Sequence, residues 1–417
     1  MSALGVIILA AGRGTRMKSG LPKALHPLGG RPMLGFLLEN ARGFSPKKIV
    51  VVAGHRMDLV KEFVGRRAIV VKQEKLLGSG HAVSQAAKEF SNFSGSVLVL
   101  YCDTPLVSAA SLRGLLKNHR ERSTDGSLLS ARVADPSGYG RIRRAAGGFV
   151  ERIVEETDAG PGEKAIREIN AGCYVFKAGK LFDALKNLRR NAAKKEYYLT
   201  DVIALLTGNG GRVEAVEATD PAEIQGVNTR KDLALLEGVM RRRLIERCME
   251  DGASFRDPST TTVDAGVRIG QDTVICPHTV LEEDSVIGRG CRIGPFARIR
   301  GGSRIGDGVV IGNFVEIVRS KIGTGTQIKH LSYIGDAEIG SGVNIGAGTV
   351  TANYDGKKKH KTIVRDGAQI GSGTILIAPV VIGRKAKTGA GAVVTKNTEV
   401  PGGSVMVGIP ARNMRKR

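Results

Sequence analysis

The chain has 417 residues and a formal net charge of +23 at pH 7, with 56 glycines, five cysteines and no tryptophan. This length predicts two or three domains with ample core. The odd cysteine count and the absence of C-x-x-C spacing argue against a disulfide framework or a structural zinc site, and predict a reduced, cytoplasmic protein. Aromatic residues make up 4% of the chain, which leaves little stacking surface for single-stranded nucleic acid. The charge therefore favours phosphorylated metabolites over nucleic acid as ligands.

Residues 1–228 alternate strand-like and helix-like segments. The strand-like runs are residues 5–10, 48–53 and 96–100, and residues 32–41 and 57–64 lie between them with helical spacing. This alternation predicts a doubly wound, Rossmann-like α/β domain, with a mostly parallel sheet and helices on both faces. The apolar run from Leu4 to Ala11 has no basic segment before it and is too short to span a bilayer. We expect it to be a first strand rather than a signal peptide, and we expect no membrane association.

A glycine-rich turn, Gly12 to Thr15, follows the first strand. Neither a Walker A loop nor a dinucleotide fingerprint fits, because position 17 is Met where those motifs need other residues. The small residues allow backbone N–H groups to approach a phosphate, and Arg13, Arg16 and Lys23 supply cations. The turn therefore predicts phosphate binding. The alternative is an ordinary tight turn with solvated arginines.

Asp103 ends the apolar run Leu98 to Cys102. An aspartate at the carboxyl end of a strand is well placed to hold Mg²⁺ against phosphate oxygens. Taken alone, an aspartate before Thr104-Pro105 is more often a turn or helix-cap residue.

Residues 229–252 are expected to form one long connecting helix. Apolar residues recur there at three- and four-residue spacing with charges between them, and Gly252 stops the pattern.

From Val263 onward an aliphatic residue returns every six residues. The series is Val263, Ile269, Ile275, Leu281, Ile287, Ile293, Ile299, Ile305, Ile311 and Ile317, then, after single-residue slips, Ile322, Ile328, Ile334, Ile339 and Ile345, and, after a break, Val364, Ile370, Leu376, Ile382, Val394, Val400 and Met406. A period of six is typical of hexapeptide repeats that wind into a left-handed parallel β-helix. We expect this β-helix over residues 253–417, with the aliphatic ladder buried inside.

The break at residues 351–361 contains four lysines and a histidine. Loops extruded from a solenoid are favoured places for function, so this one predicts an anionic ligand; a solvated charged loop is the alternative. His330 lies just before the inward Ile334. A single histidine can be structural or catalytic, so both roles stay open for His330 at this point.

Several further segments appear in one order along the chain and carry a family resemblance. They are LAAGRGTRM from Leu9, LPKALH from Leu21, Gln73 with LGSGHA from Leu77, Tyr101-Cys102-Asp103, GYGRI from Gly138, Ile153-Val154-Glu155, Ile169-Asn170-Ala171-Gly172, EYYLTD from Glu196, and Gly226-Val227-Asn228. With the hexapeptide tail, they closely resemble the GlmU family of bifunctional N-acetylglucosamine-1-phosphate uridylyltransferases / glucosamine-1-phosphate N-acetyltransferases. The resemblance implies a cytoplasmic homotrimer that makes UDP-N-acetylglucosamine for cell-wall synthesis.

For the first domain, residues 1–228, the resemblance implies a uridylyltransferase with UTP as co-substrate. The implied roles are Ala11, Gly12, Gln73 and Gly78 around the uridine, with Ser79 and Tyr101 nearby; Arg16 and Lys23 on the triphosphate; Gly140, Glu155 and Asn170 on the N-acetylglucosamine; and Asp103 and Asn228 on Mg²⁺. Ser79 stands where the family often has Thr, and Cys102 where it commonly has Gly.

For the β-helix, residues 253–417, the resemblance implies acetyl transfer from acetyl-CoA. It implies that His330 is the general base. The other implied roles are Arg300 and Lys359 on the sugar phosphate; Tyr333, Asn344 and Asn353 on the sugar and the base, with Glu316 nearby; and Asn353, Tyr354, Ser372 and Ala390 on acetyl-CoA.

One position departs from the family pattern. The family has a phosphate-binding lysine after its Asn-Phe-Val-Glu-aliphatic run, and here Val318 stands at that position. Arg319 could replace the lysine only if the corner there is irregular, because adjacent strand residues point to opposite faces; Lys321 is a further candidate. The departure keeps an alternative open, a sugar-1-phosphate nucleotidylyltransferase whose β-helix serves only oligomerisation. A basic scaffold that binds nucleic acid is a third hypothesis, which the set Lys23, Asp103 and Asn228 opposes.

Overall fold

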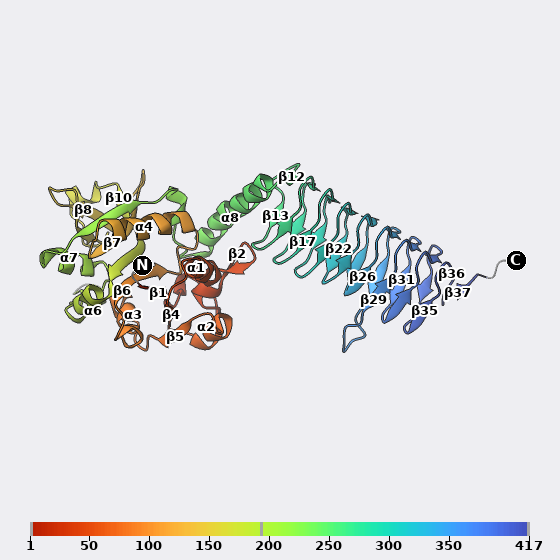
Figure 1. Ribbon diagram of the computed structural model, residues 1–417, viewed down its shortest axis with the longest axis horizontal. Coiled ribbons are helices and arrows are strands. Elements are labelled where there is room, and N and C mark those ends of the chain that lie inside the picture. The colour runs from red at the N-terminus through yellow and green to blue at the C-terminus, as the bar shows by residue number, and fades with distance from the viewer. Residues whose placement is uncertain (1–2, 192–194, 415–417) are drawn as a thin grey trace. The chain divides into compact units, whose positions relative to one another are not determined.

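The computed structural model describes residues 3–191 and 195–414 (Figure 1). The chain divides into two compact units, Met1–Glu237 and Gly238–Arg417. The first is an α/β unit and the second a parallel β-helix, so the expected fold class is confirmed. Among the described residues, no helix is long and apolar enough to cross a membrane.

The first unit is built on one mixed sheet with the strand order β11-β7-β10-β6-β1-β4-β5, extended by the hairpin β8–β9. The strands are β1 (Ala3–Ala10), β4 (Lys48–Ala53), β5 (Ile69–Lys72), β6 (Gly95–Tyr101), β7 (Gly126–Arg132), β8 (Arg141–Arg144), β9 (Val150–Val154), β10 (Glu168–Lys177) and β11 (Val213–Glu217), with a separate pair β2 (Pro27–Leu28) and β3 (Arg31–Pro32). β1 runs parallel to both of its neighbours, β4 and β6, and β10 is antiparallel to β6. The carboxyl ends of β1, β4 and β6 therefore share one edge.

Helices cover both faces of this sheet. They are α1 (Met33–Arg42), α2 (Met57–Val64), α3 (Ser79–Ser84), α4 (Ala109–Glu121), α5 (Pro161–Lys164), α6 (Ala178–Lys186) and α7 (Asp201–Gly208), with short 3₁₀ turns at Thr15–Met17, Lys23–Leu25, Ala87–Phe90 and Pro221–Ile224. Alternate residues of β1 enter different cores, as the period of two requires: Val6 and Ile8 pack with residues of α1, α2 and α4, whereas Ile7 and Leu9 pack with residues of α3, α6 and α7.

The helix α8 (Arg230–Glu250) follows the sheet. Its start is capped reciprocally: the Asp232 carboxylate accepts from the backbone N–H groups of Asn228 and Thr229 at 2.9 and 2.8 Å, and the Thr229 hydroxyl accepts from Asp232 N–H at 3.1 Å. Gly252, two residues after the helix ends, has φ 98°, a conformation that glycine adopts without strain.

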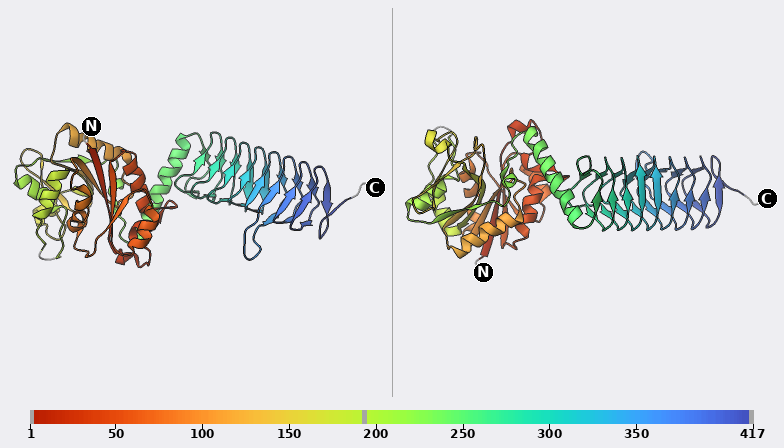
Figure 2. Two further views of the ribbon diagram at one scale, coloured as in Figure 1. Left: turned by 60° about the horizontal axis from the view of Figure 1, so that its bottom comes forward. Right: turned by 90° about the horizontal axis from the view of Figure 1, so that it is seen from above.

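The second unit winds through three sheets in turn, whose strands are parallel except for the last pair, β36 and β37 (Figure 2). The first sheet holds β12 (Ser254–Phe255), β15 (Val274–Ile275), β18 (Arg292–Ile293), β21 (Val310–Asn313), β24 (Gln327–His330), β27 (Asn344–Ile345), β30 (Gln369–Ile370), β33 (Lys387–Thr388), β36 (Val405–Val407) and β37 (Arg412–Asn413). The second holds β13 (Thr262–Val263), β16 (Val280–Leu281), β19 (Arg298–Ile299), β22 (Glu316–Val318), β25 (Tyr333–Gly335), β28 (Val350–Ala352), β31 (Ile375–Ile377) and β34 (Val393–Val394). The third holds β14 (Arg268–Ile269), β17 (Val286–Ile287), β20 (Arg304–Ile305), β23 (Lys321–Ile322), β26 (Ala337–Ile339), β29 (Thr362–Val364), β32 (Val380–Ile382) and β35 (Thr398–Val400).

The aliphatic ladder fills the interior of this β-helix. All the residues of the expected series from Val263 to Met406 are buried in one cluster. Each ladder residue stacks on its counterpart in the next coil, as Ile293 does on Ile311 and Ile311 on Ile328. Stacking buries a continuous core that no single coil could bury alone.

A second buried row was not expected from the sequence. Threonines two positions before the ladder residues are fully buried, for example Thr273 and Thr326. The Thr273 hydroxyl donates to Gly288 C=O at 2.7 Å and accepts from Cys291 N–H at 3.0 Å. Thr326 bonds in the same way to Gly340 and Val343. The hydroxyls pair backbone groups at the corners that would otherwise be buried without a partner.

The slips in the hexad period change the register of the coils. The spacing between ladder residues is one residue shorter than a full hexad from Ile317 to Ile322 and from Ile334 to Ile339. Counterparts in these coils therefore lie 17 residues apart along the chain. The corner residues Arg319 and Asp336 both take a left-handed conformation with φ 48°. Beyond them, residues 354–361 leave the coil as the loop beside β29 in Figure 1, closed by a bridge between Tyr354 and Lys359.

Candidate active sites

A cavity of about 330 Å³ opens at the carboxyl ends of β1 and β6. The two strands hold this edge together beyond the sheet, because Cys102 N–H donates to Leu9 C=O at 3.1 Å. The lining residues are Leu9, Ala10, Ala11, Gly12, Arg13, Lys23, Gln73, Leu76, Gly78, Ser79, Ala82, Tyr101, Cys102, Asp103 and Glu196. Eight residues that the sequence predicted for the nucleotide site are in this lining: Ala11, Gly12, Lys23, Gln73, Gly78, Ser79, Tyr101 and Asp103.

Close backbone approaches explain two of the glycines around this cavity. Gly78 has φ 99°, and a β-carbon there would lie 2.6 Å from the Tyr197 carbonyl oxygen. Gly14 has φ 61°, and a β-carbon there would lie 2.9 Å from Cβ of Lys23. Both glycines are therefore needed for the backbone path. The buried Gln73 amide donates to Gly78 C=O at 3.1 Å, which fixes the cavity wall between the two segments.

A cluster of two cations and two oxygen ligands stands at the rim. Lys23 Nζ lies 2.8 Å from Asp103 Oδ2 and 3.0 Å from Asn228 Oδ1, and Arg16 Nη2 donates to the same Asn228 oxygen at 2.9 Å. The backbone supports this arrangement, because Val227 N–H donates to Asp103 C=O at 2.8 Å. The fold thus brings the glycine-rich loop, the end of β6 and the segment before α8 to one point.

Asp103 and Asn228 fit a divalent cation. Their carboxylate and amide oxygens are hard ligands, and both converge on one positively charged atom, the Lys23 ammonium. Among the residues that the structure describes, no group of three or more His, Cys, Asp or Glu side chains could hold a metal. A Mg²⁺ ion there would take its other ligands from water and phosphate oxygens, as this ion commonly does.

The residues expected around the sugar form a second cluster, on β8 to β10. Asn170 N–H donates to Gly140 C=O at 2.9 Å, and a β-carbon on Gly140 would lie 3.6 Å from Glu155 Oε2. Burial raises the pKa of Glu155. The Thr200 hydroxyl donates to Glu155 Oε1 at 2.9 Å, and this hydrogen bond offsets part of the rise. The three predicted residues are therefore neighbours, and they stand outside the lining of the 330 Å³ cavity.

The two departures in the nucleotide site are both accommodated. The Ser79 hydroxyl accepts from Leu199 N–H at 3.0 Å. Cys102 is 5% exposed, and burial raises the pKa of its thiol to about 12. The thiol therefore stays neutral and acts as a small apolar side chain in the cavity wall.

In the β-helix, His330 is paired with Asn313. The two residues are register partners on β24 and β21, and His330 Nδ1 lies 3.0 Å from Asn313 Oδ1. An amide oxygen only accepts, so this contact fits the neutral tautomer with its proton on Nδ1, in which Nε2 has a free lone pair. The His330 side chain is exposed to solvent. Sequence reasoning missed Asn313, and its position 17 residues before His330 was the available signal.

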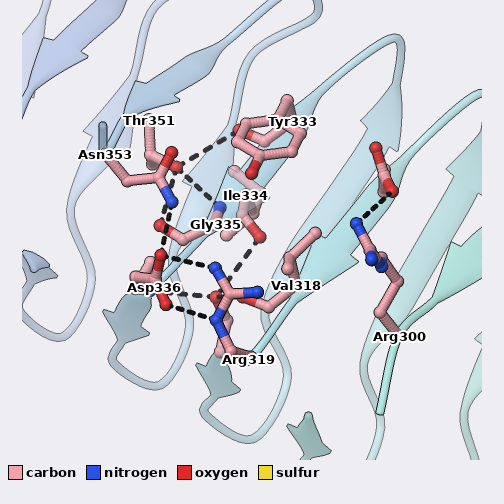
Figure 3. Close-up of polar contacts among 12 residues, drawn as sticks. Arg300, Val318, Arg319, Tyr333, Ile334, Gly335, Asp336, Thr351 and Asn353 are labelled. Carbon is pink, nitrogen blue, oxygen red and sulfur yellow. Dashed lines mark hydrogen bonds and ion pairs between the residues drawn. The ribbon is translucent and has the colours of Figure 1, made fainter. Parts of the chain in front are cut away.

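The expected phosphate end of the site contains Arg300 and Val318 (Figure 3). Arg300 N–H donates to Ile317 C=O at 2.8 Å, which places Arg300 beside Val318 on the neighbouring strand. The Arg300 guanidinium stands between Glu282 and Glu316, at 3.7 and 3.6 Å. Val318 is 1% exposed. No cation therefore stands at the position of the family lysine.

Arg319 lies at an irregular corner, as its use in place of that lysine would require, but it is held by Asp336. Arg319 Nε donates to Asp336 Oδ1 and Nη2 to Oδ2, both at 2.7 Å (Figure 3). Asn353 Nδ2 donates to the same Oδ2. Hydrogen bonding by Arg319, and then by Asn353, lowers the pKa of Asp336. The other candidate, Lys321, is on β23 in a different sheet from Arg300.

The remaining residues expected in the acetyl site lie along the outside of successive coils. Glu316 and Tyr333 are register partners. Exposed side chains are those of Asn344, Tyr354, Lys359, Ser372 and Ala390. Tyr354 is 61% exposed and its hydroxyl donates to Gly356 C=O at 2.7 Å within the loop.

Both units match models of known protein families. Residues 6–196 match the model of the MobA-like NTP transferase domain, and residues 284–319 match that of the bacterial transferase hexapeptide repeats. The chain is 47% identical over 410 residues to a protein of Pelotomaculum thermopropionicum named "Bifunctional protein GlmU", covering 90% of each. Proteins with the same name from Shouchella clausii and Brevibacillus brevis are each 42% identical, covering 95% and 98% of this chain and 94% and 95% of theirs.

Proposed function

The chain belongs to the family of bifunctional GlmU proteins, and from this membership we propose which of its residues serve each of its two reactions. The enzyme makes UDP-N-acetylglucosamine: it acetylates glucosamine-1-phosphate with acetyl-CoA, and transfers a uridylyl group from UTP to N-acetylglucosamine-1-phosphate, releasing pyrophosphate. Identity over nearly the whole chain favours this function over the nucleotidylyltransferase-only alternative. We assign uridylyl transfer to residues 1–228, a connecting helix to residues 229–252 and acetyl transfer to residues 253–417.

The observation that carries the uridylyl assignment is the convergence of Lys23, Asp103 and Asn228 at the rim of the cavity. Uridine binds in the cavity beside Ala11, Gly12, Gln73 and Gly78, and Arg16 and Lys23 neutralise the triphosphate. Ser79 and Tyr101 also contact the nucleotide, and the sugar is bound by Gly140, Glu155 and Asn170.

Asp103 and Asn228 would hold Mg²⁺, which supplies charge neutralisation at the phosphate oxygens. Lys23 bridges these two oxygens. A divalent ion held there would repel the Lys23 ammonium, which would then be available to neutralise a phosphate of the substrate. The sugar-phosphate oxygen then attacks the α-phosphorus of UTP in line. This step needs positioning and charge neutralisation, with no covalent intermediate on the chain.

For acetyl transfer, His330 Nε2 takes a proton from the glucosamine amine as the nitrogen attacks the thioester carbon. The N–C bond forms and the C–S bond breaks, and the CoA thiol leaves. Asn313 holds the imidazole in the tautomer that this role requires. Arg300 and Lys359 bind the sugar phosphate; Tyr333, Asn344 and Asn353 position the sugar and the base; Asn353, Tyr354, Ser372 and Ala390 contact acetyl-CoA.

We propose that the protein works as a homotrimer through its β-helix. An exposed apolar stack supports this: the rings of His278 and Phe296 lie 4.8 Å apart, and those of Phe296 and Phe314 5.3 Å apart. Leu331 stands at the next corner, and Phe314 and Leu331 are 56% and 61% exposed. They directly follow Asn313 and His330, so a neighbouring subunit that covered this stack would also border the catalytic histidine.

We also propose a cytoplasmic location. The five cysteines are all free and buried, which suits a compartment that keeps thiols reduced.

The test of the function uses each half-reaction by itself. With UTP and N-acetylglucosamine-1-phosphate, the purified protein should release pyrophosphate, and removal of Mg²⁺ with EDTA should stop the release. With glucosamine-1-phosphate and acetyl-CoA alone, it should release free thiol, and EDTA should leave that release unchanged. Thiol release that depends on UTP would contradict two separate sites.

A further inference from the structure

Three side chains, 17 residues apart from one to the next, form a chain of hydrogen bonds along one edge of the β-helix. Arg319 donates twice to Asp336 from the coil before it, and Asn353 donates to Asp336 from the coil after it (Figure 3). The three residues lie at the ends of β22, β25 and β28, in successive coils of the second sheet. We infer that Asp336 is a positioning residue for acetyl transfer, which acts through Asn353, and that Arg319 is the counter-ion of Asp336 rather than a phosphate ligand. This inference rests on the proposed role of Asn353 in the acetyl site.

Asn353 is the root of the loop that carries the proposed contacts Tyr354 and Lys359. Asn353 is 7% exposed, its side chain donates to Asp336, and its backbone C=O accepts from His360 N–H at 2.7 Å. The two ends of the loop therefore meet at Asn353. A displacement of this one residue changes the direction in which the whole loop leaves the coil.

At its far end, the loop is joined to the coil before it by an ion pair of 2.8 Å between Lys361 and Glu338. Its inner contacts are local: the Asp355 carboxylate accepts from the N–H groups of Lys357 and Lys358 at 2.9 and 2.7 Å, and pairs with His360 Nε2 at 2.7 Å. These bonds shape the tip of the loop but connect it to no other coil. The Asp336–Asn353 bond does join the root of the loop to the coil before it.

Asp336 is itself built into the coil. Its backbone N–H donates to Val318 C=O at 2.9 Å, and its carboxylate side chain is 19% exposed. The bidentate guanidinium fixes both carboxylate oxygens in one plane, which aims Oδ2 at Asn353. The Nε–Nη2 edge of Arg319 is used in this way and its charge is matched by the carboxylate, so a phosphate would meet only the Nη1 side of a neutralised guanidinium. Arg319 is thus not a replacement for the family lysine that is missing at position 318.

The experiment measures acetyl transfer in Asp336→Ala, Arg319→Ala, Asn353→Ala and the double variant Asp336→Ala/Asn353→Ala. Glu399→Ala is the matched control, because it removes one carboxylate from an exposed position of the same β-helix, on β35 and outside the loop. Uridylyl transfer by each variant serves as an internal control for the amount of active protein, and thermal unfolding as the control for the fold of the β-helix.

We expect Asp336→Ala to lower kcat/KM for acetyl-CoA about ten- to a hundredfold, the range for a displaced positioning group. Arg319→Ala should have a smaller effect on the same parameter and little effect on the KM for glucosamine-1-phosphate. Glu399→Ala should be close to wild type. In the Asn353→Ala background, Asp336→Ala should add little further loss, because the residue through which it acts is gone.

A readout without substrates separates this inference from the proposed function. Hydrogen exchange of the His360 and Lys358 amides should accelerate in Asp336→Ala and stay unchanged in Glu399→Ala. If wild type transfers no acetyl group but exchange responds as expected, the proposed function fails and the anchoring stands. If Asp336→Ala and Asn353→Ala lower acetyl transfer additively, or if Arg319→Ala raises the KM for glucosamine-1-phosphate tenfold or more, the inference is overturned.

Discussion

Arg319 is bound to Asp336 by two parallel hydrogen bonds of 2.7 Å, at the corner where the sequence left open a substitute for the missing family lysine. The corner is irregular, with φ 48° at Arg319, so the geometric condition for a substitute is met. The guanidinium is nevertheless committed to a carboxylate. The sugar phosphate is therefore left with Arg300 and Lys359 among the cations proposed for it.

The first prediction is that Val318→Lys lowers the KM for glucosamine-1-phosphate about ten- to a hundredfold and changes kcat little. A charge-assisted hydrogen bond to phosphate contributes roughly 1.5–3 kcal/mol, and binding that is equal in ground and transition states appears in KM. Because Val318 is 1% exposed, the thermal stability of the variant should be measured alongside its kinetics.

Val318→Met is the control, since it adds length without charge. An unchanged KM in a stable Val318→Lys variant, together with a severe loss in Arg319→Ala, would show that Arg319 supplies the phosphate cation after all.

The second prediction concerns Asp103. Asp103→Asn should slow pyrophosphate release by several orders of magnitude, because it removes the one carboxylate of the proposed Mg²⁺ pair and the charge partner of Lys23. Thiol release by the same protein should be unaffected. Asp135→Asn is an isosteric control outside the cavity lining. Normal pyrophosphate release by Asp103→Asn would remove this residue from the metal site.

The third prediction separates two residues of the acetyl site. His330→Ala should abolish most thiol release at every substrate concentration, because it removes the base. Asn313→Ala should lower kcat about ten- to a hundredfold with little change in either KM, because it frees the imidazole to rotate and change tautomer. Equal activity of Asn313→Ala and wild type would mean that the 3.0 Å contact does not orient the base.

The fourth prediction is that Phe314→Glu breaks the trimer. The change places a charge in the exposed aromatic stack, so sedimentation should show the mass of one 44.2 kDa chain instead of three. Thiol release should fall with the loss of assembly, while pyrophosphate release persists. Leu235→Glu alters a residue of similar exposure, 60%, outside the stack, and should remain trimeric. A wild-type protein that sediments as a monomer would contradict the trimer outright.

The sequence allowed the architecture to be predicted because both periods have a direct geometric meaning. A period of six fixed the ladder from Val263 to Met406, and strand–helix alternation indicated the doubly wound sheet. The cavity residues near the strand ends, such as Asp103, followed from the rule that ligands bind at carboxyl edges. Asn228 was assigned to the same site from the family resemblance alone, because it lies 125 residues after Asp103 in the chain.

Contacts between coils could not be predicted, because they depend on the number of residues in each turn. The slips after Ile317 and Ile334 shorten the coils to 17 residues, and only this spacing pairs Asn313 with His330 and Arg319 with Asp336. The left-handed conformation at Arg319 and Asp336 is likewise uncommon for residues other than glycine. A corner within a full hexad shares it, as at Phe296 with φ 54°, so this conformation belongs to the corners of the β-helix in general rather than to the slips.

The most direct test of the two-reaction account supplies glucosamine-1-phosphate, acetyl-CoA, UTP and Mg²⁺ together, and follows free thiol and pyrophosphate separately. Wild type should release thiol first and pyrophosphate after a lag. His330→Ala should release neither, but should regain pyrophosphate release when N-acetylglucosamine-1-phosphate is added; Asp103→Asn should release thiol only. If wild type releases pyrophosphate from N-acetylglucosamine-1-phosphate but never releases thiol at high glucosamine-1-phosphate, the acetyl half of the account is wrong and the β-helix serves assembly alone.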